Sequence, residues 1–225
     1  TALMVIFMFI AINYIIQVIE HTFVQEDIYN KLQLVFEKDL QDHEIELSTD
    51  GAIRFSIDSI DNREELFKEA DPEPTPYFKK ILDEFLPKYW AILESDSTYF
   101  DYIKEIRIEG HADPRHYFKK TDIIRTEEVS YLNNLELSQN RAKNVLKYLR
   151  EQPLYLNADP AEKARMDFLF TSIGFSYSRT LNDQGNYVYL DTNQVTNNKI
   201  SRRVEFRIVT SNEKLVEKII KHNGN

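Results

Sequence analysis

The chain begins with a segment in which apolar residues are almost continuous. Residues 1–19 contain only three polar side chains, those of Thr1, Asn13 and Gln17. As a helix this segment would be about 28 Å long, close to the ~30 Å hydrocarbon thickness of a bilayer. We therefore predict a transmembrane helix. A buried core helix or the apolar region of a signal peptide are the alternatives, but the run is long for a signal peptide and no small-residue cleavage site follows it.

The residues that flank this segment predict its orientation. No Lys or Arg precedes Lys31, whereas Glu20, Glu26 and Asp27 follow the run closely. Because Lys and Arg concentrate on the cytoplasmic side of membrane helices, we expect residues 20–225 to lie outside the cytoplasm. The run starts with Thr rather than Met, so we also expect the natural protein to extend upstream.

Residues 20–41 have the period of an amphipathic helix. Val24, Ile28, Leu32 and Val35 recur at helical spacing with charged residues between them. Such a stripe either pairs with a second copy of the chain, as a short stalk, or packs as one face of a helical bundle. The pattern alone leaves both interpretations open.

The segment that follows alternates with the period of a strand. Asp50-Gly51 separates two short alternating runs, which is a strong signal for a β-hairpin. The alternating apolar residues are Ile45 and Leu47 before the turn and Ile53, Phe55 and Ile57 after it.

The rest of the chain alternates between the two periods. A loop ends at Pro76, Pro87 is expected to kink or divide the helix that follows, and residues 114–130 form a long polar connection. The predicted elements are a helix over 77–93, a strand over 102–110, a helix over 131–149, a strand over 165–175, a small hairpin turning at 183–186, a strand over 202–210 and a helix over 213–221. Strands that alternate with helices indicate an α/β sandwich, with helices over one sheet.

One stripe of the helix predicted over 131–149 is polar. Asn134, Ser138 and Arg141 share a side at spacings of four and three, while Ala142 begins the apolar, core-facing stripe. A guanidinium close to a helix N-terminus, with its backbone N–H groups, would bind a carboxylate. A solvated surface charge is the simpler alternative.

A second candidate group lies in "EGHADPRH", where a strand is expected to end. Asp113 is placed to accept hydrogen bonds from a ligand amine, or simply to cap the following turn. His111, Asp113 and His116 could be interpreted as metal ligands, but their spacing matches no standard zinc site. Asp113 together with Arg141 would complement a zwitterion, such as an uncross-linked amino-acid centre of a cell-wall peptide. We expect no metal and no cofactor.

The third group is Arg202-Arg203, at the start of the last predicted strand. Successive strand residues face opposite sides, so we expect one arginine to face the site and the other to face solvent. A pair of surface arginines is the alternative.

Composition narrows the classes of function. The net charge of −9 argues against a nucleic-acid partner, and the absence of cysteine excludes disulfides within these 225 residues. Hydrophobic residues make up 42% of the chain, enough for a packed core. The chain has no Ser/His/Asp ordering, no glycine-rich phosphate loop and no nucleophile elbow, so we expect no enzyme.

Four segments together resemble the OmpA/MotB-type peptidoglycan-binding domain. In chain order they read "EGHAD", "NLELSQNRA", "SIGFS" and "RRVEFRI", and the resemblance covers roughly residues 40–212. It implies that Asp113 and Arg141 bind the diaminopimelate centre of the peptide stem. It further implies roles for three residues of the loop-to-helix part of that pocket and one of the last strand: Asn134, Leu137, Ser138 and Arg202.

The chain also departs from the family pattern. Ala112 stands in place of Thr, Ser201 in place of Asn and Thr180 in place of Pro. The connection from Asp113 to Asn134 is longer than usual, so it could cover or reshape the pocket.

The N-terminal "TALMVIFMFIA" resembles the single membrane helix of MotB-type stator subunits. In that family an Asp three positions before the Thr carries the translocated ion, a position upstream of Thr1. The resemblance implies a B-type subunit in the bacterial inner membrane with its C-terminal domain in the periplasm. Two copies would sit within five A-type subunits of the MotA kind, driven by protons or sodium ions and fixed to peptidoglycan.

The resemblance divides the chain into a membrane helix (1–19), a helical stalk (20–41), the wall-binding domain (42–212) and a terminal helix and tail (213–225). Only about twenty residues separate Ile19 from the first hairpin strand, whereas flagellar MotB proteins usually have a long linker there. This favours the B-type subunit of the Zorya anti-phage defence motors. A flagellar stator subunit and a passive wall anchor are the alternatives.

Overall fold

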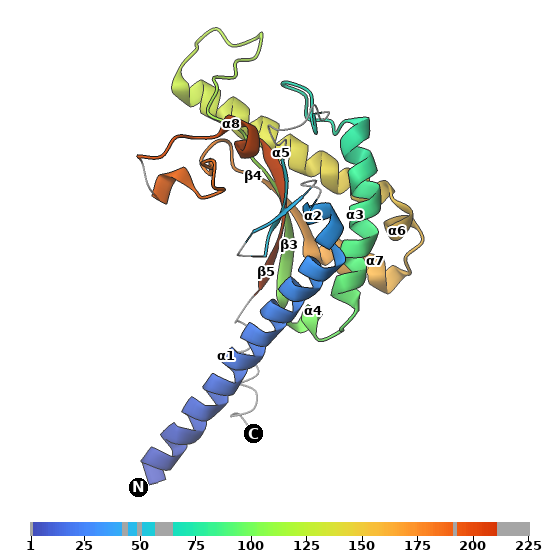
Figure 1. The fold of residues 1–225 in the computed structure, drawn as a ribbon, viewed down its shortest axis with the longest axis vertical. Coiled ribbons are helices and arrows are strands. Elements are labelled where there is room, and N and C mark those ends of the chain that lie inside the picture. The colour runs from blue at the N-terminus through green and yellow to red at the C-terminus, as the bar shows by residue number, and fades with distance from the viewer. Residues whose placement is uncertain (1, 42–44, 49–50, 57–64, 191–192, 211–225) are drawn as a thin grey trace.

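The computed structural model describes residues 2–41, 45–48, 51–56, 65–190 and 193–210, and its centre is a mixed β-sheet (Figure 1). The strand order is β1-β2-β5-β3-β4; β3 and β4 are parallel and the other neighbours antiparallel. The strands are β1 (Glu46–Leu47), β2 (Ile53–Ser56), β3 (Ile103–Gly110), β4 (Phe170–Gly174) and β5 (Arg203–Thr210).

Helices cover one face of this sheet. Phe206 of β5 and Phe55 of β2 point to this face and meet Phe85 of α3, with ring centroids 4.9–5.8 Å apart. The helices are α1 (Ala2–Val35), α2 (Glu37–Gln41), α3 (Pro76–Glu94), α4 (Tyr99–Tyr102), α5 (Glu127–Glu151), α6 (Pro153–Leu156), α7 (Pro160–Leu169) and α8 (Asn198–Ser201), with a 3-10 turn η1 (Val188–Leu190). The predicted α/β sandwich with helices over one sheet agrees with this arrangement.

The opposite face of the sheet is buried beneath the chain that runs from β4 to β5, which lies on the other side of the sheet from α3 and α7 (Figure 1). Arg203 donates to the carbonyl of Arg179 at 3.1 Å, and Arg54 donates to the carbonyl of Gly185 at 3.2 Å. This connection therefore closes over charged side chains of the central strands.

The predicted β-hairpin is confirmed as β1 and β2, which pair antiparallel around Gly51. Gly51 has a φ of +79°, a conformation that glycine adopts at little cost. Asp50 and Ile57, which the hairpin prediction included, lie outside the described residues. The strands predicted over 102–110 and 202–210 are confirmed as β3 and β5.

Two predictions about the limits of helices and strands were wrong. Pro87 does not divide α3, which runs unbroken from Pro76 to Glu94. Residues 165–169 are helical rather than strand, because Asp159 caps α7 by accepting hydrogen bonds from two backbone N–H groups and Pro160 occupies the first helical position. The small hairpin predicted to turn at 183–186 is present in its shortest form, as one antiparallel bridge between Leu181 and Tyr187.

The helix that carries the polar stripe begins earlier than predicted. Thr126 is its N-cap and accepts a hydrogen bond from the backbone N–H of Val129 at 3.3 Å, so α5 starts at Glu127. Arg141 consequently lies in the middle of α5, where every backbone N–H is used within the helix. The prediction that Arg141 lies close to a helix N-terminus was therefore wrong, and the backbone N–H groups of α5 contribute nothing beside its guanidinium.

The amphipathic stripe of the N-terminal region packs within its own chain. Ile28 and Leu32 are buried in the main core, as is Phe36, whereas Val35 is 43% exposed. Of the two interpretations left open, the bundle-packing face describes this contact. Towards the other end of α1, residues 3–16 are exposed, and the N-terminus lies far from the sheet (Figure 1).

Among the residues that the structure describes, we find no helix that combines the length and hydropathy needed to span a bilayer. The helix predicted over 213–221 lies outside the described residues.

Candidate functional site

A charged cleft of about 380 Å³ opens where β3 ends, between α5 and the segment that precedes α3. Of the six residues singled out in the sequence, five line it: Asp113, Asn134, Leu137, Arg141 and Arg202. Asp113 and Arg202 lie far apart in the sequence. They line one cavity because β3 contacts both α5 and β5.

Asp113 supplies the carboxylate of the cleft and is only 4% exposed. Its Oδ1 accepts from the backbone N–H of Arg115 at 3.0 Å, so the predicted turn cap is present. Its two oxygens also accept from Nε of Arg115 at 3.1 and 3.0 Å, and Nε of Arg202 lies 3.3 Å from Oδ2. The carboxylate therefore sits between two guanidinium groups.

Arg141 supplies a nearly buried cation, with 8% of the residue exposed. It donates from Nε to the carbonyl of Asp71 and from a terminal nitrogen to the carbonyl of Lys68, both at 3.1 Å, and its guanidinium lies 4.9 Å from the ring centroid of Phe67. Burial, followed by the positive charge of Arg202, lowers its pKa to about 10. Arg141 thus stays charged at neutral pH.

The turn formed by residues 68–71 holds Arg141 in place, and no sequence motif predicts this contact. Ala70 adopts a φ of +55°, which is unusual for a residue other than glycine. The turn is closed by the N–H of Asp71, which donates to the carbonyl of Lys68 at 3.1 Å. This conformation directs two carbonyls at one guanidinium. Backbone acceptors of this kind have no residue-type signature, so only the fold reveals them.

Ser138, the sixth predicted residue, does not line the cleft. It is fully buried, and its hydroxyl accepts from the N–H of Ser176 at 3.0 Å and donates to the carbonyl of Leu135 at 2.9 Å. A Cβ on Gly110 would lie 2.1 Å from the Ser138 carbonyl oxygen, and one on Gly174 would lie 2.4 Å from the next backbone nitrogen. Ser138 and the two glycines therefore let α5 cross the strand ends at close range.

The long connection between Asp113 and α5 folds back onto that helix. Asn133 donates to a carboxylate oxygen of Asp122 at 2.6 Å and to the carbonyl of Tyr117 at 3.2 Å. Asn134 donates to the carbonyls of Ser130 and Arg115 at 3.1 and 3.3 Å. Residues 115–117 contribute to the wall of the cleft, and the cleft remains open to solvent.

Of the two adjacent arginines, only Arg202 lies where the alternation of the strand predicted. Arg202 faces the cleft and reaches Asp113, as predicted for the site-facing member. Arg203, expected to face solvent, is instead 3% exposed, and its Nε lies 2.5 Å from the carboxylate of Glu205. The connection between β4 and β5 covers that face, which the alternation of one strand cannot predict.

The described residues contain one trio with the donor spacing of a metal site: Glu109, His111 and Glu205. It differs from the trio considered from sequence, His111, Asp113 and His116. Guanidinium groups already occupy its carboxylates, because Arg207 contacts both glutamates and Arg203 contacts Glu205. A divalent cation would have to displace them against their charge, so this trio is better described as part of an ion network.

The same network explains the titration of its members. Burial, followed by the charge of Arg203, lowers the pKa of His111 to about 4, so the imidazole is neutral at pH 7. Burial would raise the pKa of Glu205, but the arginines around it lower that pKa well below the ordinary glutamate value. The network thus consists of ionised carboxylates, guanidinium groups and a neutral imidazole.

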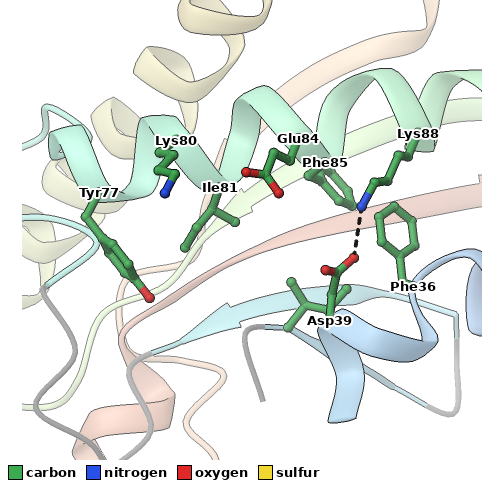
Figure 2. A pocket seen from close by; sticks show the side chains of 9 residues that line it. Phe36, Asp39, Tyr77, Lys80, Ile81, Glu84, Phe85 and Lys88 are labelled. Atoms are coloured by element: carbon green, nitrogen blue, oxygen red, sulfur yellow. Dashed lines mark hydrogen bonds and ion pairs between the residues drawn. The ribbon is translucent and has the colours of Figure 1, made fainter. Parts of the chain in front are cut away.

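A smaller depression of about 130 Å³ lies between α2 and α3 (Figure 2). Its apolar part comprises core residues such as Phe36 and Phe85, whose rings are 5.2 Å apart. Lys88 from α3 reaches Asp39 from α2, with 3.4 Å between Nζ and Oδ2 (Figure 2). We interpret this depression as the seam along which α2 packs on α3.

Known proteins resemble the chain at two levels. In fold, a MotB-like protein from Desulfovibrio vulgaris superposes with a TM-score of 0.50 at 22% identity, covering 83% of this chain and 91% of that one. The periplasmic domain of Helicobacter pylori MotB gives a TM-score of 0.41 at 16% identity, over 80% and 88% of the two chains, which is too distant to argue from. No protein-family model matches the chain.

In sequence, the chain is 33% identical to Zorya protein ZorB of Escherichia coli, a match that covers 97% of this chain and 87% of that protein. Identity at this level over nearly the whole length establishes common descent. The chain belongs to the ZorB family.

Proposed function

We propose that this protein is a wall-binding B subunit of a Zorya-type membrane motor, and that its cleft binds the free zwitterionic end of diaminopimelate in uncross-linked peptidoglycan. The observation that carries this proposal is the placement of one buried carboxylate, Asp113, and two guanidinium groups, Arg141 and Arg202, in a single cavity. An ammonium group would pair with the carboxylate, and a carboxylate with the guanidinium groups.

The burial of Asp113 and Arg141 gives the cleft its selectivity. Charge-assisted hydrogen bonds to arginine are strong, and they gain strength where water is excluded. A lysine-type peptide stem has the ammonium group but lacks the neighbouring carboxylate, so Arg141 would gain no partner from it. A site built for a polar group typically rejects the analogue that lacks it. We therefore expect diaminopimelate-type stems to bind in preference to lysine-type stems.

Binding of purified muropeptides, measured by calorimetry, tests this proposal. We expect Asp113→Asn and Arg141→Gln each to reduce the affinity for a diaminopimelate-type muropeptide at least tenfold. Arg150→Gln is the matched control, because it removes the same charge from an exposed position on the same helix, where Arg150 pairs with Asp167. If the parent and the three variants bind with equal affinity, and all have native circular dichroism, the cleft is not the binding site.

We also propose that the N-terminal part of α1 lies in the bacterial inner membrane and the sheet domain in the periplasm. Two features support this: the apolar run of residues 1–19 and the exposure of the side chains of residues 3–16. Within the motor, two copies would associate with five MotA- or ZorA-like subunits and work with protons or sodium ions. The subunit itself would be a non-catalytic, fixed part of the motor.

Extraction of the full-length protein from membranes and mass analysis of what co-purifies test this arrangement. A five-to-two complex with an A-type subunit that has a long cytoplasmic tail would support the defence motor. A partner with a short torque-generating cytoplasmic domain would favour a flagellar stator. If no membrane partner co-purifies, a passive wall anchor is the better description.

A further inference from the structure

We infer that Arg115 is an internal competitor of the ligand's ammonium group: its guanidinium occupies the Asp113 carboxylate in the free protein and must leave before a ligand binds. The inference rests on the proposed function of the cleft, and it assigns Arg115 as a specificity-determining residue. Arg115 belongs to the long connection between β3 and α5, and it lies outside the four segments that resemble the OmpA/MotB-type domain.

The contacts of Asp113 support this assignment. Both of its carboxylate oxygens accept from the side chain of Arg115, at 3.1 and 3.0 Å, which is the interaction that an incoming ammonium group needs. Arg202 reaches only Oδ2, at 3.3 Å. In the free protein, the carboxylate of Asp113 is thus paired mainly with Arg115.

The exposure of the two partners is unequal, and this makes displacement feasible. The side chain of Asp113 is 5% exposed, whereas that of Arg115 is 53% exposed. A buried carboxylate has to keep a partner, but a half-exposed guanidinium regains water when it leaves. Exchange of Arg115 for a ligand ammonium group therefore keeps Asp113 ionised and paired, and the guanidinium that leaves returns to water.

The opposite wall of the cleft offers the displaced guanidinium a second place. Glu65 and Glu69 line the same cavity and, after Asp113 itself, contribute to raising the pKa of Arg115. A guanidinium released from Asp113 would move towards these two carboxylates. It would then lie over the entrance of the cleft and neutralise charges that otherwise repel the carboxylate of the ligand.

The exchange also defines which ligands are accepted. A stem peptide whose free amine is acetylated cannot replace Arg115 at Asp113, because it brings no positive charge. Such a ligand meets the Arg115–Asp113 pair intact and would have to bind through its carboxylate alone, at Arg141 and Arg202. Arg115 therefore makes the free ammonium group a requirement for entry.

Arg115→Gln tests the inference, since it removes the competing charge but keeps the backbone N–H that caps Asp113. We expect about twofold to fivefold tighter binding of a diaminopimelate-type muropeptide, the factor that corresponds to a weak, half-exposed ion pair. The unliganded variant should melt slightly lower than the parent, because Asp113 has lost its partner. A residue with a purely structural role would lower both the affinity and the melting temperature, so the opposite signs are diagnostic.

Arg125→Gln is the matched control. It makes the same charge change in the same connection, at a residue that lies over the ring of Phe118 and does not line the cleft. We expect it to change neither affinity nor melting temperature by a comparable amount. Arg115→Lys, which keeps the charge but loses the planar donor geometry, should bind with intermediate affinity.

The outcomes separate this inference from the proposed function. If the parent binds the muropeptide and Arg115→Gln binds equally or more weakly, Arg115 is not a competitor and the inference is overturned while the function stands. If neither protein binds, and Asp113→Asn and Arg141→Gln change nothing, the proposed function fails and the inference fails with it.

Discussion

Alternate residues of β5 point to opposite faces of the sheet, and the two faces are buried by different chemistry. Towards the helices, Phe206 meets the rings of Phe55, Phe85 and Tyr89 at 5.0–5.8 Å. Towards the other face, Glu205 is equally inaccessible but is surrounded by arginines. One strand therefore supplies a dispersive aromatic core on one side and an ion network on the other.

The difference lies in how each face responds to change. Apolar packing is non-directional, so loss of one side chain costs the area and volume removed and little else. An ion network is all or none, because removal of one charge leaves its partners buried and uncompensated. The aromatic face should therefore respond to volume and the ionic face to protonation.

Phe206→Ala should produce the largest loss of stability. The ring is fully buried and has three aromatic neighbours, so we expect about 3–5 kcal/mol less free energy of unfolding. Urea unfolding at pH 7 measures it, and the loss should not depend on salt. Val209→Ala, on the same strand but only half-buried, is the control and should cost about 1 kcal/mol. Similar losses for both would show that the aromatic cluster is not the centre of the core.

Glu205→Gln should cost slightly less, about 3 kcal/mol, although it changes no volume. It removes the negative charge that accepts hydrogen bonds from Arg54, Arg203 and Arg207. Urea unfolding again gives the value, and the loss should shrink at high concentrations of an anion that can reach the arginines. A loss below about 1 kcal/mol would mean that Glu109 alone balances the cluster.

Acidification should weaken the ionic face by a smaller amount, through His111. Its pKa is lowered to about 4 in the folded protein, whereas an unfolded histidine takes up its proton near pH 6.5. The full contribution to stability is therefore present above pH 6.5 and is lost as the pH falls towards 4. At pH 5 the loss from this group is about 2 kcal/mol.

Unfolding at pH 7.5 and pH 5.0 measures this dependence. Glu109 and Glu205 also have lowered pKa values, so their contribution is lost only below the ordinary glutamate range and does not enter this interval. In His111→Gln the difference between the two pH values should become smaller, whatever the absolute stability of the variant. An unchanged pH dependence in the variant would assign the effect to other histidines.

Glu46→Gln should have the smallest effect and defines the edge of the ionic face. Glu46 pairs with Arg54 at 3.0 Å, but its side chain is 47% exposed. Pairs of this kind contribute about 0.2–1 kcal/mol, so we expect a loss below 1 kcal/mol in the same unfolding assay. A loss comparable to that of Glu205→Gln would show that the network extends to the rim of the sheet.

The sequence could predict the aromatic face but not the ionic one. The period-2 pattern of Val204, Phe206 and Ile208 identified β5 because those residues face the core. The same alternation led us to expect one of Arg202 and Arg203 to face solvent, but Arg203 is buried because residues 175–190 fold over it. That covering contact joins segments far apart in the chain, so no local period records it.

The cleft was predictable to a similar degree. Asp113, Arg141 and Arg202 could be named because their motifs place them at element ends that the fold brings together. The residue types could not show that the carbonyls of Lys68 and Asp71 hold Arg141. Nor could the spacing show that Ser138 contributes its backbone and hydroxyl to close packing rather than to a ligand site.

Because α1 is one uninterrupted helix, it fixes the distance between its two ends and also the rotation of one end relative to the other about the helix axis. Ile28 and Leu32 are locked into the core, and the same 34-residue helix extends back to Ala2. Each residue added to an α-helix lengthens it by about 1.5 Å and turns the chain about the helix axis by about 100°. Insertion of one residue would thus rotate the apolar end about the helix axis relative to the core. Insertion of seven residues would return it to within about 20° of its original orientation. Any change in the length of α1 therefore also changes the direction in which its apolar end faces.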